Sequence, residues 1–464
     1  MGSVSTAPTS ELWARASVSC CSRGPEHRPT LRNTSEDRVC SETHRRSHDG
    51  HFPVPMTHPS DSSLPPSLDF SDRALNLTSS NIVHLSRLAE KFNAINLAEG
   101  FPDFPAPPAI KNAAIAAINA DFNQYRHVQG LCDQVAAMFE TTQGLKVNPK
   151  TQVTICCGQS EALVAAVLAV INERDEVVLL DPSYETYEAS VKLAGAKAKH
   201  VSLDPPNWNL DILRLENAMG SRTKAVIVNS PHNPTGKVFN EEELADIAKL
   251  CCRFDCLAIT DEVYEHLVYT GTRHRSLATF PGMQDRTIVT SSISKTFSVT
   301  GWRIGWAIAP EAISSAIGSI HEKLVDSAPA PFQEAAVSAL SSGPEYYLNL
   351  RAAYLDRRNL VCEMLEEAGL SVQYKPEGSF FVFARLPETY PLKDVDYVAE
   401  LIKSAGVVIV PGCGFFHADS SSVDSYKDRY VRVAFCKNTA TLLSAREAIR
   451  RHCKKSKGSE PAIM

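Results

Sequence analysis

Short apolar runs alternate with segments of helical periodicity through the middle of this 464-residue chain. Each run suits a strand that is buried on both faces. Strands that alternate with helices form a mostly parallel sheet covered by helices on both sides, so we expect an α/β protein. In such sheets ligands bind beyond the carboxyl ends of the strands. The runs lie at 153–157, 177–180, 224–228, 256–260 and 287–290.

A lysine lies just beyond the last of these runs, in the stretch 287–306, which reads TIVTSSISKTFSVTGWRIGW. Lys295 follows a cluster of hydroxyls, and Arg303 comes eight positions later. A lysine amine becomes a nucleophile when desolvation or a nearby cation lowers its pKa. Hydroxyls and an arginine fork suit a phosphate dianion. This combination indicates a site for pyridoxal 5′-phosphate (PLP), whereas a solvated lysine in a Ser/Thr-rich loop is the structural alternative.

The other strand ends carry the remaining groups that PLP requires. Asp261 can keep the pyridine nitrogen protonated, and Asn233 and Tyr264 are neutral donors for the phenolic oxygen. Tyr184 offers an aromatic face to the ring. Each of these residues also has a structural explanation, as a helix cap, a turn residue or part of the core. Donors for the phosphate are expected where a helix begins, at Gly158, Gln159 and Ser160.

Five blocks of sequence, in chain order, resemble a known family. NSPHNPTG at 229–236, DEVY at 261–264 and SxxKTFxxTGWRxGW from Ser292 resemble the class I aminotransferases of PLP fold type I. INLAEGFPDFP at 95–105 and NQY at 123–125 are similar to the branch of kynurenine–oxoglutarate transaminase, glutamine transaminase K and methionine aminotransferase. The resemblance covers about 81–450. It implies a large domain, with a seven-stranded type of mostly parallel sheet flanked by helices, and a smaller α+β domain.

The resemblance implies roles for residues at these positions. Lys295 would bind the cofactor aldehyde and carry the proton that moves during transamination. Asp261 would pair with the ring nitrogen, and Asn233 and Tyr264 would bind the phenolic oxygen. The phosphate would be held by Gln159, Ser160, Ser292 and Arg303.

Further residues would bind the substrate or join two subunits. Arg432 would clamp the substrate carboxylate, with Gly100 and Asn233 beside it. Tyr125 would reach the phosphate of a neighbouring subunit, which implies a homodimer with shared active sites.

The activity that the resemblance implies is a ping-pong transamination between an L-amino acid and a 2-oxo acid. Kynurenine, glutamine, methionine and aromatic amino acids all remain open as donors. Ala98 and Glu99 stand where the kynurenine enzymes often have Gly-Gln, and Ile82 stands near a position that is commonly aromatic. A PLP-dependent β-lyase acting on cysteine conjugates and a non-catalytic PLP-fold protein are the alternatives.

Composition limits the partners and the location. Net charge is −6 and no apolar run reaches 18 residues, so neither nucleic acid nor a membrane is expected as a partner. No CxxC or HExxH motif occurs, so no metal site is expected. We expect a cytoplasmic protein, with mitochondrial or plastid targeting by an N-terminal extension as the alternative. The expected segments are a disordered extension 1–66, a small-domain segment 67–107, the large domain 108–340, the small domain 341–455 and a frayed tail 456–464.

Overall fold

The computed structural model describes residues 70–75, 77, 80–269, 271–417 and 421–458, all within one compact unit, Met56–Met464. The expected N-terminal extension therefore lies outside the described residues. Helix α14 (Thr439–Gly458) includes 456–458, which the sequence placed in the frayed tail, and the rest of that tail is not described. No helix in the described part of the chain has the length and apolar character needed to span a bilayer.

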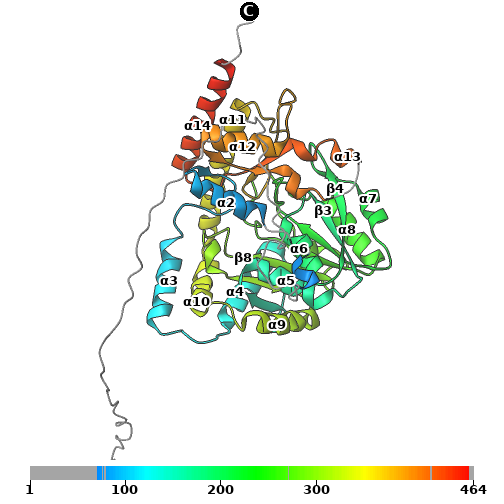
Figure 1. Cartoon of the computed structure of the whole chain (residues 1–464). Coiled ribbons are helices and arrows are strands. Elements are labelled where there is room, and N and C mark those ends of the chain that lie inside the picture. The colour runs from blue at the N-terminus through cyan, green and yellow to red at the C-terminus, as the bar shows by residue number, and fades with distance from the viewer. Residues whose placement is uncertain (1–69, 76, 78–79, 270, 418–420, 459–464) are drawn as a thin grey trace, which may run out of the picture. The chain divides into compact units, whose positions relative to one another are not determined.

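An eight-stranded sheet forms the centre of the fold (Figure 1). Neighbouring strands from β8 through β7, β6 and β3 to β4 pair in parallel, whereas β9 is antiparallel to β8 and β2. This confirms the expected mostly parallel α/β sheet, to which the two-residue β5 adds an antiparallel edge. In spatial order the strands are β2 (Val153–Cys156), β9 (Gly305–Ile308), β8 (Thr287–Ser292), β7 (Leu257–Asp261), β6 (Thr223–Asn229), β3 (Glu176–Asp181), β4 (Lys197–Asp204) and β5 (Asn209–Leu210).

All five strands predicted for the main sheet are present, but β4, β5 and β9 were not predicted. The first half of β4 carries one exposed lysine, one partly buried lysine and a partly buried histidine, so it lacks the apolar run of a central strand. β9 is short and follows directly on the Gly-Trp-Arg segment.

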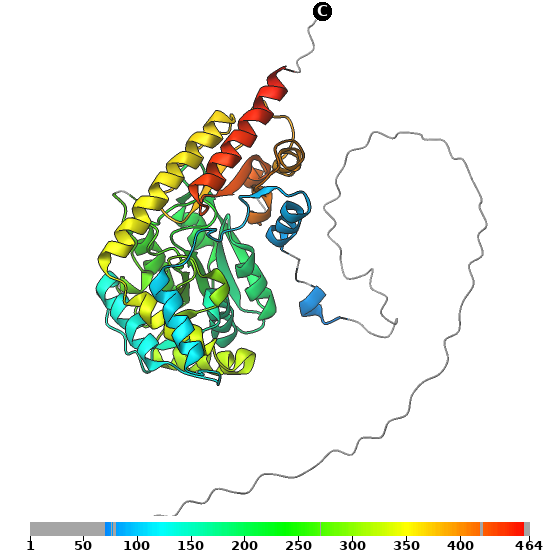
Figure 2. The same cartoon turned by 90° about the vertical axis from the view of Figure 1, so that its left-hand side faces the viewer.

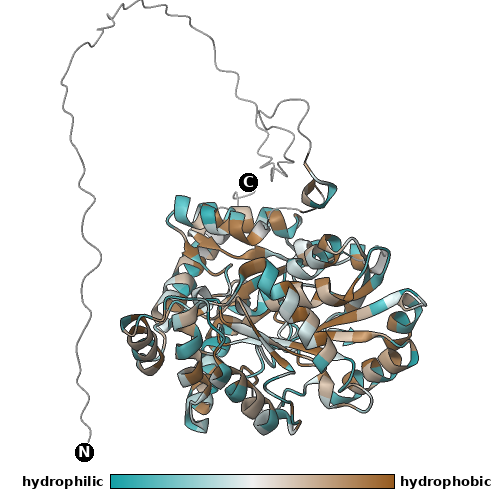
Figure 3. Cartoon of the chain, turned by 90° about the horizontal axis from the view of Figure 1, so that it is seen from below, coloured by the Kyte–Doolittle hydropathy of each residue, from teal (hydrophilic) through white to brown (hydrophobic). Residues whose placement is uncertain are grey.

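Helices cover both faces of this sheet because neighbouring strand residues point to opposite sides. Val177 and Ile227 belong to the core cluster beneath α5, α6 and α9, whereas Val178 and Val226 belong to the cluster that includes α8. Figure 3 shows that the strands are largely apolar. It also shows hydrophilic residues on the outward faces of the helices. The flanking helices are α4 (Gln129–Gln143), α5 (Gly158–Val170), α6 (Glu185–Leu193), α7 (Ile212–Ala218), α8 (Glu241–Arg253), α9 (Glu311–Val325) and α10 (Ala330–Leu340).

The C-terminal part is a smaller α+β assembly, which confirms the expected fold class. A three-stranded antiparallel sheet packs with α11 and α12, and Figure 2 shows α11 beside α14. The apolar run 407–410 reads in the sequence as a single strand, but the structure divides it between two sheets. The elements are α11 (Pro344–Glu367), β10 (Phe381–Arg385), α12 (Asp394–Ala405), β11 (Val407–Val408), β12 (Val410–Pro411), α13 (Ser421–Asp424) and β13 (Tyr430–Ala434).

The N-terminal described segment joins this smaller part. β1 (Ile95–Asn96) pairs in parallel with β11, so residues about 310 positions apart become neighbours. The loop that follows β1 then passes over the carboxyl ends of the main strands, where Gly100 accepts a hydrogen bond from Lys295. The remaining helices of this segment are α1 (Asp72–Leu75), α2 (Asn81–Lys91) and α3 (Pro108–Asn119).

Candidate active site

A cavity of about 290 Å³ lies at the carboxyl ends of the main strands. Its walls come from the main sheet, from the loop after β1 and from β10 and β13. Gly158 lies next to this cavity, and Tyr125 lies elsewhere. The predicted residues that line it are Gly100, Gln159, Ser160, Tyr184, Asn233, Asp261, Tyr264, Ser292, Lys295, Arg303 and Arg432.

Lys295 lies on the turn after β8 and is partly buried. Its Nζ donates a hydrogen bond of 2.7 Å to the carbonyl oxygen of Gly100. Burial lowers the pKa of Lys295 to about 8, and the positive charges of Arg303 and Arg432 act in the same direction. More of the amine is therefore neutral and nucleophilic near neutral pH than in an ordinary solvated lysine.

Asp261 ends β7 and is buried. Oδ2 accepts a hydrogen bond of 2.8 Å from the Tyr187 hydroxyl, and Oδ1 accepts one of 3.2 Å from the backbone N–H of Val263. Burial raises the pKa of Asp261 to about 6, while these two donors and the charge of Lys295 hold it lower. The carboxylate can therefore remain charged at neutral pH and pair with a cation inside the cavity.

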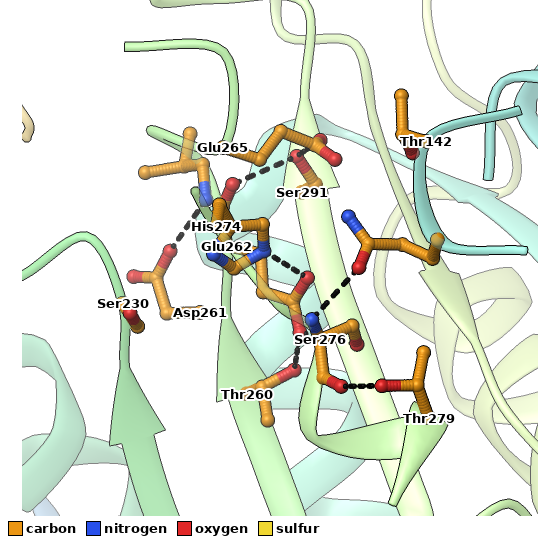
Figure 4. A network of polar contacts seen from close by, with 12 residues as sticks. Thr142, Ser230, Thr260, Asp261, Glu262, Glu265, His274, Ser276, Thr279 and Ser291 are labelled. Atoms are coloured by element: carbon orange, nitrogen blue, oxygen red, sulfur yellow. Dashed lines mark hydrogen bonds and ion pairs between the residues drawn. The ribbon is translucent and has the colours of Figure 1, made fainter. Parts of the chain in front are cut away.

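A buried polar network fixes the backbone beside Asp261 (Figure 4). Glu262 points away from the cavity and accepts hydrogen bonds from the hydroxyls of Thr260 and Ser276, at 2.8 and 2.7 Å. Its other oxygen accepts one of 2.8 Å from His274 Nε2. Asn229, at the end of the neighbouring strand, donates to the carbonyl of Asp261 at 2.9 Å. The strand end that carries Asp261 is thereby held on both sides.

Backbone and guanidinium groups converge at the other end of the cavity. Helix α5 begins at Gly158, whose φ of +80° is in the left-handed region. A Cβ there would lie 2.2 Å from Nη2 of Arg303, so glycine is needed for this approach. Arg303 is itself held by the carbonyls of Thr300 and Cys157, at 2.8 and 3.3 Å. A helix N-terminus with an arginine beside it attracts a phosphate.

Hydroxyl groups complete this candidate phosphate-binding site. Ser292 Oγ accepts a hydrogen bond of 3.3 Å from the N–H of Ser294. The Oγ of Ser294 is buried, lines the cavity and has no hydrogen-bond partner among the described residues. Gln159 donates to Thr290 at 3.2 Å. The unpartnered hydroxyl fits a ligand oxygen, so these residues suit the phosphate of PLP.

Arg432 enters the cavity from β13 and is 1% exposed. Nη1 donates to Asn233 Oδ1 at 2.9 Å, Nη2 donates to the carbonyl of Ala98 at 2.8 Å, and Nε is buried without a partner among the described residues. The guanidinium lies 4.2 Å from the ring centre of Phe381. Burial lowers the pKa of Arg432 to about 10, so the group is still cationic near neutral pH.

Two tyrosines form further walls. Tyr264 packs edge-on against Phe380 at 5.0 Å, and burial holds its pKa well above the ordinary value, so its hydroxyl is a donor. Tyr184 lies edge-on to Tyr187 at 5.8 Å.

The backbone of Gly100 also borders the cavity. A Cβ at Gly100 would meet Phe381 Cζ at 2.7 Å, so only glycine brings this backbone so close to the cavity.

Tyr125 does not reach this cavity. The side chain is 79% exposed and lines a second cavity of about 450 Å³ together with Arg126 and His127. One copy of the chain thus leaves Tyr125 facing outward.

Sequence reasoning missed several residues of the site. Tyr187 donates a hydrogen bond to Asp261, and Phe381 packs against the guanidinium of Arg432. Neither Tyr187 nor Phe381 belongs to a motif. The spacing of three between Tyr184 and Tyr187 at the start of a helix was the available signal, since such residues share a face. Ser80 and Glu185 also line the cavity, and the Ser80 hydroxyl donates to the Glu185 carboxylate. The other wall residues that were not predicted as site residues include Ile82, Val83, Glu99, Phe101 and Thr300.

Comparisons with known proteins agree with this geometry. The family model for aminotransferase class I and II matches residues 93–449. A kynurenine–oxoglutarate transaminase 3 of Bos taurus is 35% identical over 80% of this chain and 88% of the relative. Methionine aminotransferase of Escherichia coli is 32% identical over 79% of this chain and 94% of the relative. The solved N-succinyldiaminopimelate aminotransferase of Mycobacterium tuberculosis superposes with a TM-score of 0.79 at 35% identity, covering 83% of this chain and all of that one.

Proposed function

Because the chain belongs to the class I and II aminotransferases, which depend on PLP, we propose that it transfers an amino group from an L-amino acid to a 2-oxo acid. The proposed donors are kynurenine, glutamine, methionine or an aromatic amino acid. N-succinyldiaminopimelate joins them, because one structural relative carries that name. The proposal is supported above all by one observation: Lys295, Asp261 and Arg432 line a single cavity.

When bound, PLP supplies an aldehyde for the substrate amine and an electron sink for the carbanion at Cα. Lys295 would hold the cofactor and then act as the base that takes the proton from Cα and delivers it to C4′ of the cofactor, because its lowered pKa of about 8 lets Nζ both accept and donate a proton. Asp261 would keep the ring nitrogen protonated. Tyr264 would donate to the phenolic oxygen.

Asn233 would connect the cofactor and the substrate. Its Oδ1 already accepts from Arg432 at 2.9 Å, so the donor end of the same amide is directed elsewhere and suits the phenolic oxygen. Arg432 would bind the substrate carboxylate bidentately, because a planar fork matches a carboxylate. The backbone of Gly100 would lie beside that carboxylate.

The phosphate would be bound by the start of α5, with Gly158, Gln159 and Ser160, and by Ser292 and Arg303. Tyr184 would stack on the ring. These assignments are supported by the common cavity that Gln159, Ser160, Tyr184, Ser292 and Arg303 line, and by the close approach of Gly158 to Arg303.

A homodimer is part of the proposal. The outward-facing Tyr125 would reach the phosphate of the partner and complete a shared site, which would explain why so large an aromatic side chain is 79% exposed in a single copy. The division into 67–107, 108–340 and 341–455 and the cytoplasmic location, with organellar targeting as the alternative, also stay predictions.

The absorption spectrum of the purified protein with PLP tests the function. We expect the visible cofactor band to bleach when a donor amino acid is added and to return when a 2-oxo acid follows. The rate of bleaching ranks the candidate donors. Lys295→Ala should show no turnover, and turnover at the wild-type rate in that variant would refute the proposal.

The same experiment separates the alternatives. Pyruvate and ammonia released from a cysteine conjugate without any 2-oxo acid would indicate a β-lyase. Absence of a protein-bound cofactor band, after PLP has been supplied and the unbound excess removed, would favour the non-catalytic alternative.

A further inference from the structure

A second group of reactive side chains lies outside the catalytic cavity, between the sheet and two helices. Cys156 ends β2, Glu161 is in the first turn of α5 and His321 is on the buried face of α9. One ligand atom from each, a thiol sulfur, a carboxylate oxygen and an imidazole nitrogen, lie within 4.8 Å of one another. The proposed transamination uses none of the three.

The contacts within the group leave one polar atom unsatisfied. His321 Nδ1 lies 3.0 Å from Glu161 Oε2, which also accepts a hydrogen bond of 2.9 Å from the backbone N–H of Cys157. Glu161 Oε1 is buried and has no hydrogen-bond partner among the described residues. Cys156 is 0% exposed, and its thiol makes a weak contact of 3.7 Å with the carbonyl of Thr154. A buried carboxylate oxygen without a partner is rare unless a ligand satisfies it.

We propose that Cys156, Glu161 and His321 bind a Zn²⁺ ion. Thiolate, imidazole and carboxylate are the ligands that zinc prefers, at roughly 2.3, 2.0–2.1 and 2.0–2.2 Å. Around a tetrahedral ion at these lengths the ligand atoms lie roughly 3.3–3.6 Å apart. In the structure His321 Nδ1 and Glu161 Oε2 are 3.0 Å apart, and all three ligand atoms lie within 4.8 Å of one another. Small side-chain rotations would therefore bring the three atoms to the spacing that zinc requires.

Charge and proton balance also agree with a divalent ion. The ion binds the thiolate and the carboxylate, and one thiol proton is released to water, so the filled site is electrically neutral if His321 is neutral. Neutrality matters because the site is buried. Without an ion, burial and then the charge of Glu161 hold the pKa of the Cys156 thiol well above its ordinary value, so the thiol is protonated and inert.

One of the three side chains borders the second cavity. His321 also lines the cavity of about 450 Å³, whose wall carries the carboxylates of Glu322 and Asp326. A bound ion would join β2, the start of α5 and α9, and so would stiffen the helix N-terminus at which the phosphate is proposed to bind.

Equilibrium dialysis of the holoenzyme against buffered Zn²⁺, with metal analysis of the protein, tests the site. We expect about one tightly bound equivalent per chain in the wild type, and binding at least ~10-fold weaker in Cys156→Ser and His321→Gln. Both substitutions are conservative, and Glu161→Gln provides a third variant of nearly unchanged volume. The visible cofactor band shows that each variant is folded. Cys362→Ser, which removes a buried free thiol on α11, is the matched control and should bind as the wild type does.

Co²⁺ gives a second readout. In the wild type a thiolate-to-cobalt charge-transfer band should accompany the visible bands of a tetrahedral site, and Cys156→Ser should lack it. Equal zinc binding by the wild type and by Cys156→Ser would overturn the proposal, and so would a wild type that binds no zinc. Neither result would bear on the transaminase activity, which is measured separately.

Discussion

The hydroxyl of Tyr187, in the first turn of α6, donates a hydrogen bond of 2.8 Å to Oδ2 of Asp261 at the end of β7. Both side chains are buried, so the bond is shielded from water. It favours the charged form of the carboxyl and holds the pKa of Asp261 below the value that burial alone would produce. Tyr187 thus acts as a positioning residue for the proposed partner of the ring nitrogen.

Removing this donor should change how activity depends on pH. In Tyr187→Phe the ionised form of Asp261 loses one hydrogen bond, so its pKa rises further, and a higher pH is needed to ionise it. We expect the acid limb of kcat/KM to shift to higher pH by ~1 unit, with activity recovering as pH rises. Tyr397→Phe, a tyrosine on α12, should leave the profile unchanged. An unaltered acid limb in Tyr187→Phe would mean that the hydroxyl does not act on Asp261.

The contribution of the planar guanidinium of Arg432 to substrate binding can be tested separately from the contribution of its charge. Arg432→Lys keeps a cation but loses the paired N–H groups that contact Asn233 and Ala98 and would hold the substrate carboxylate. We expect KM for the amino acid and for the 2-oxo acid to rise together by roughly 10–100-fold, because both substrates carry the carboxylate. Arg385→Lys on β10 serves as the control. If only one of the two KM values changed, the carboxylate would be bound elsewhere.

The requirement for glycine at position 158, where α5 begins, can be tested by adding a single methyl group. Gly158→Ala places Cβ at 2.2 Å from Arg303 Nη2 and forces alanine to a φ of +80°. The arginine must move, so PLP affinity, measured by absorbance titration, should fall at least ~10-fold. In Gly130→Ala, on α4, the added Cβ meets no atom within 4 Å, and we expect wild-type affinity. Tight PLP binding by Gly158→Ala would show that PLP binding does not depend on the position of Arg303 beside Gly158.

Lys295 should destabilise the cofactor-free protein at neutral pH. Its folded pKa of about 8 lies below the ordinary lysine value of 10.5, so below pH 8 folding must bury a charged amine. Between pH 8 and 10.5 the unfolded chain binds more protons than the folded one, and this penalty disappears as pH rises. Lys295→Met should therefore raise the free energy of unfolding by ~1–3 kcal/mol at pH 7, with the loss of attraction to Asp261 offsetting part of the gain.

Thermal unfolding of the cofactor-free protein measures this effect. The advantage of Lys295→Met over the wild type should shrink when the pH is raised from 7 to 9.5. Lys111→Met, at an exposed position of α3, should show no such pH-dependent gain. A constant difference between Lys295→Met and the wild type at both pH values would refute the assignment of the lowered pKa.

The sequence by itself determined the α/β class, five strands of the main sheet and the set of residues around Lys295. These features are local: apolar runs and polar residues at strand ends are encoded within a few positions. Parallel strands then bring those ends to one edge, which is why eleven of the predicted residues line one cavity. β4 was not predicted because the first half of the strand is polar and so lacks an apolar run. Residues 407–410 read as one strand because all four are apolar, and nothing in the local sequence marks a break at Ile409.

Only the tertiary structure decided which distant residues meet. Tyr187 meets Asp261 across 74 positions, Asn233 meets Arg432 across 199, and Glu161 meets His321 across 160. No spacing motif could reveal the group of Cys156, Glu161 and His321, because its members come from a strand and two separate helices. The physical reason is that such contacts depend on how helices pack on a sheet, and packing depends on the whole chain rather than on any segment of it.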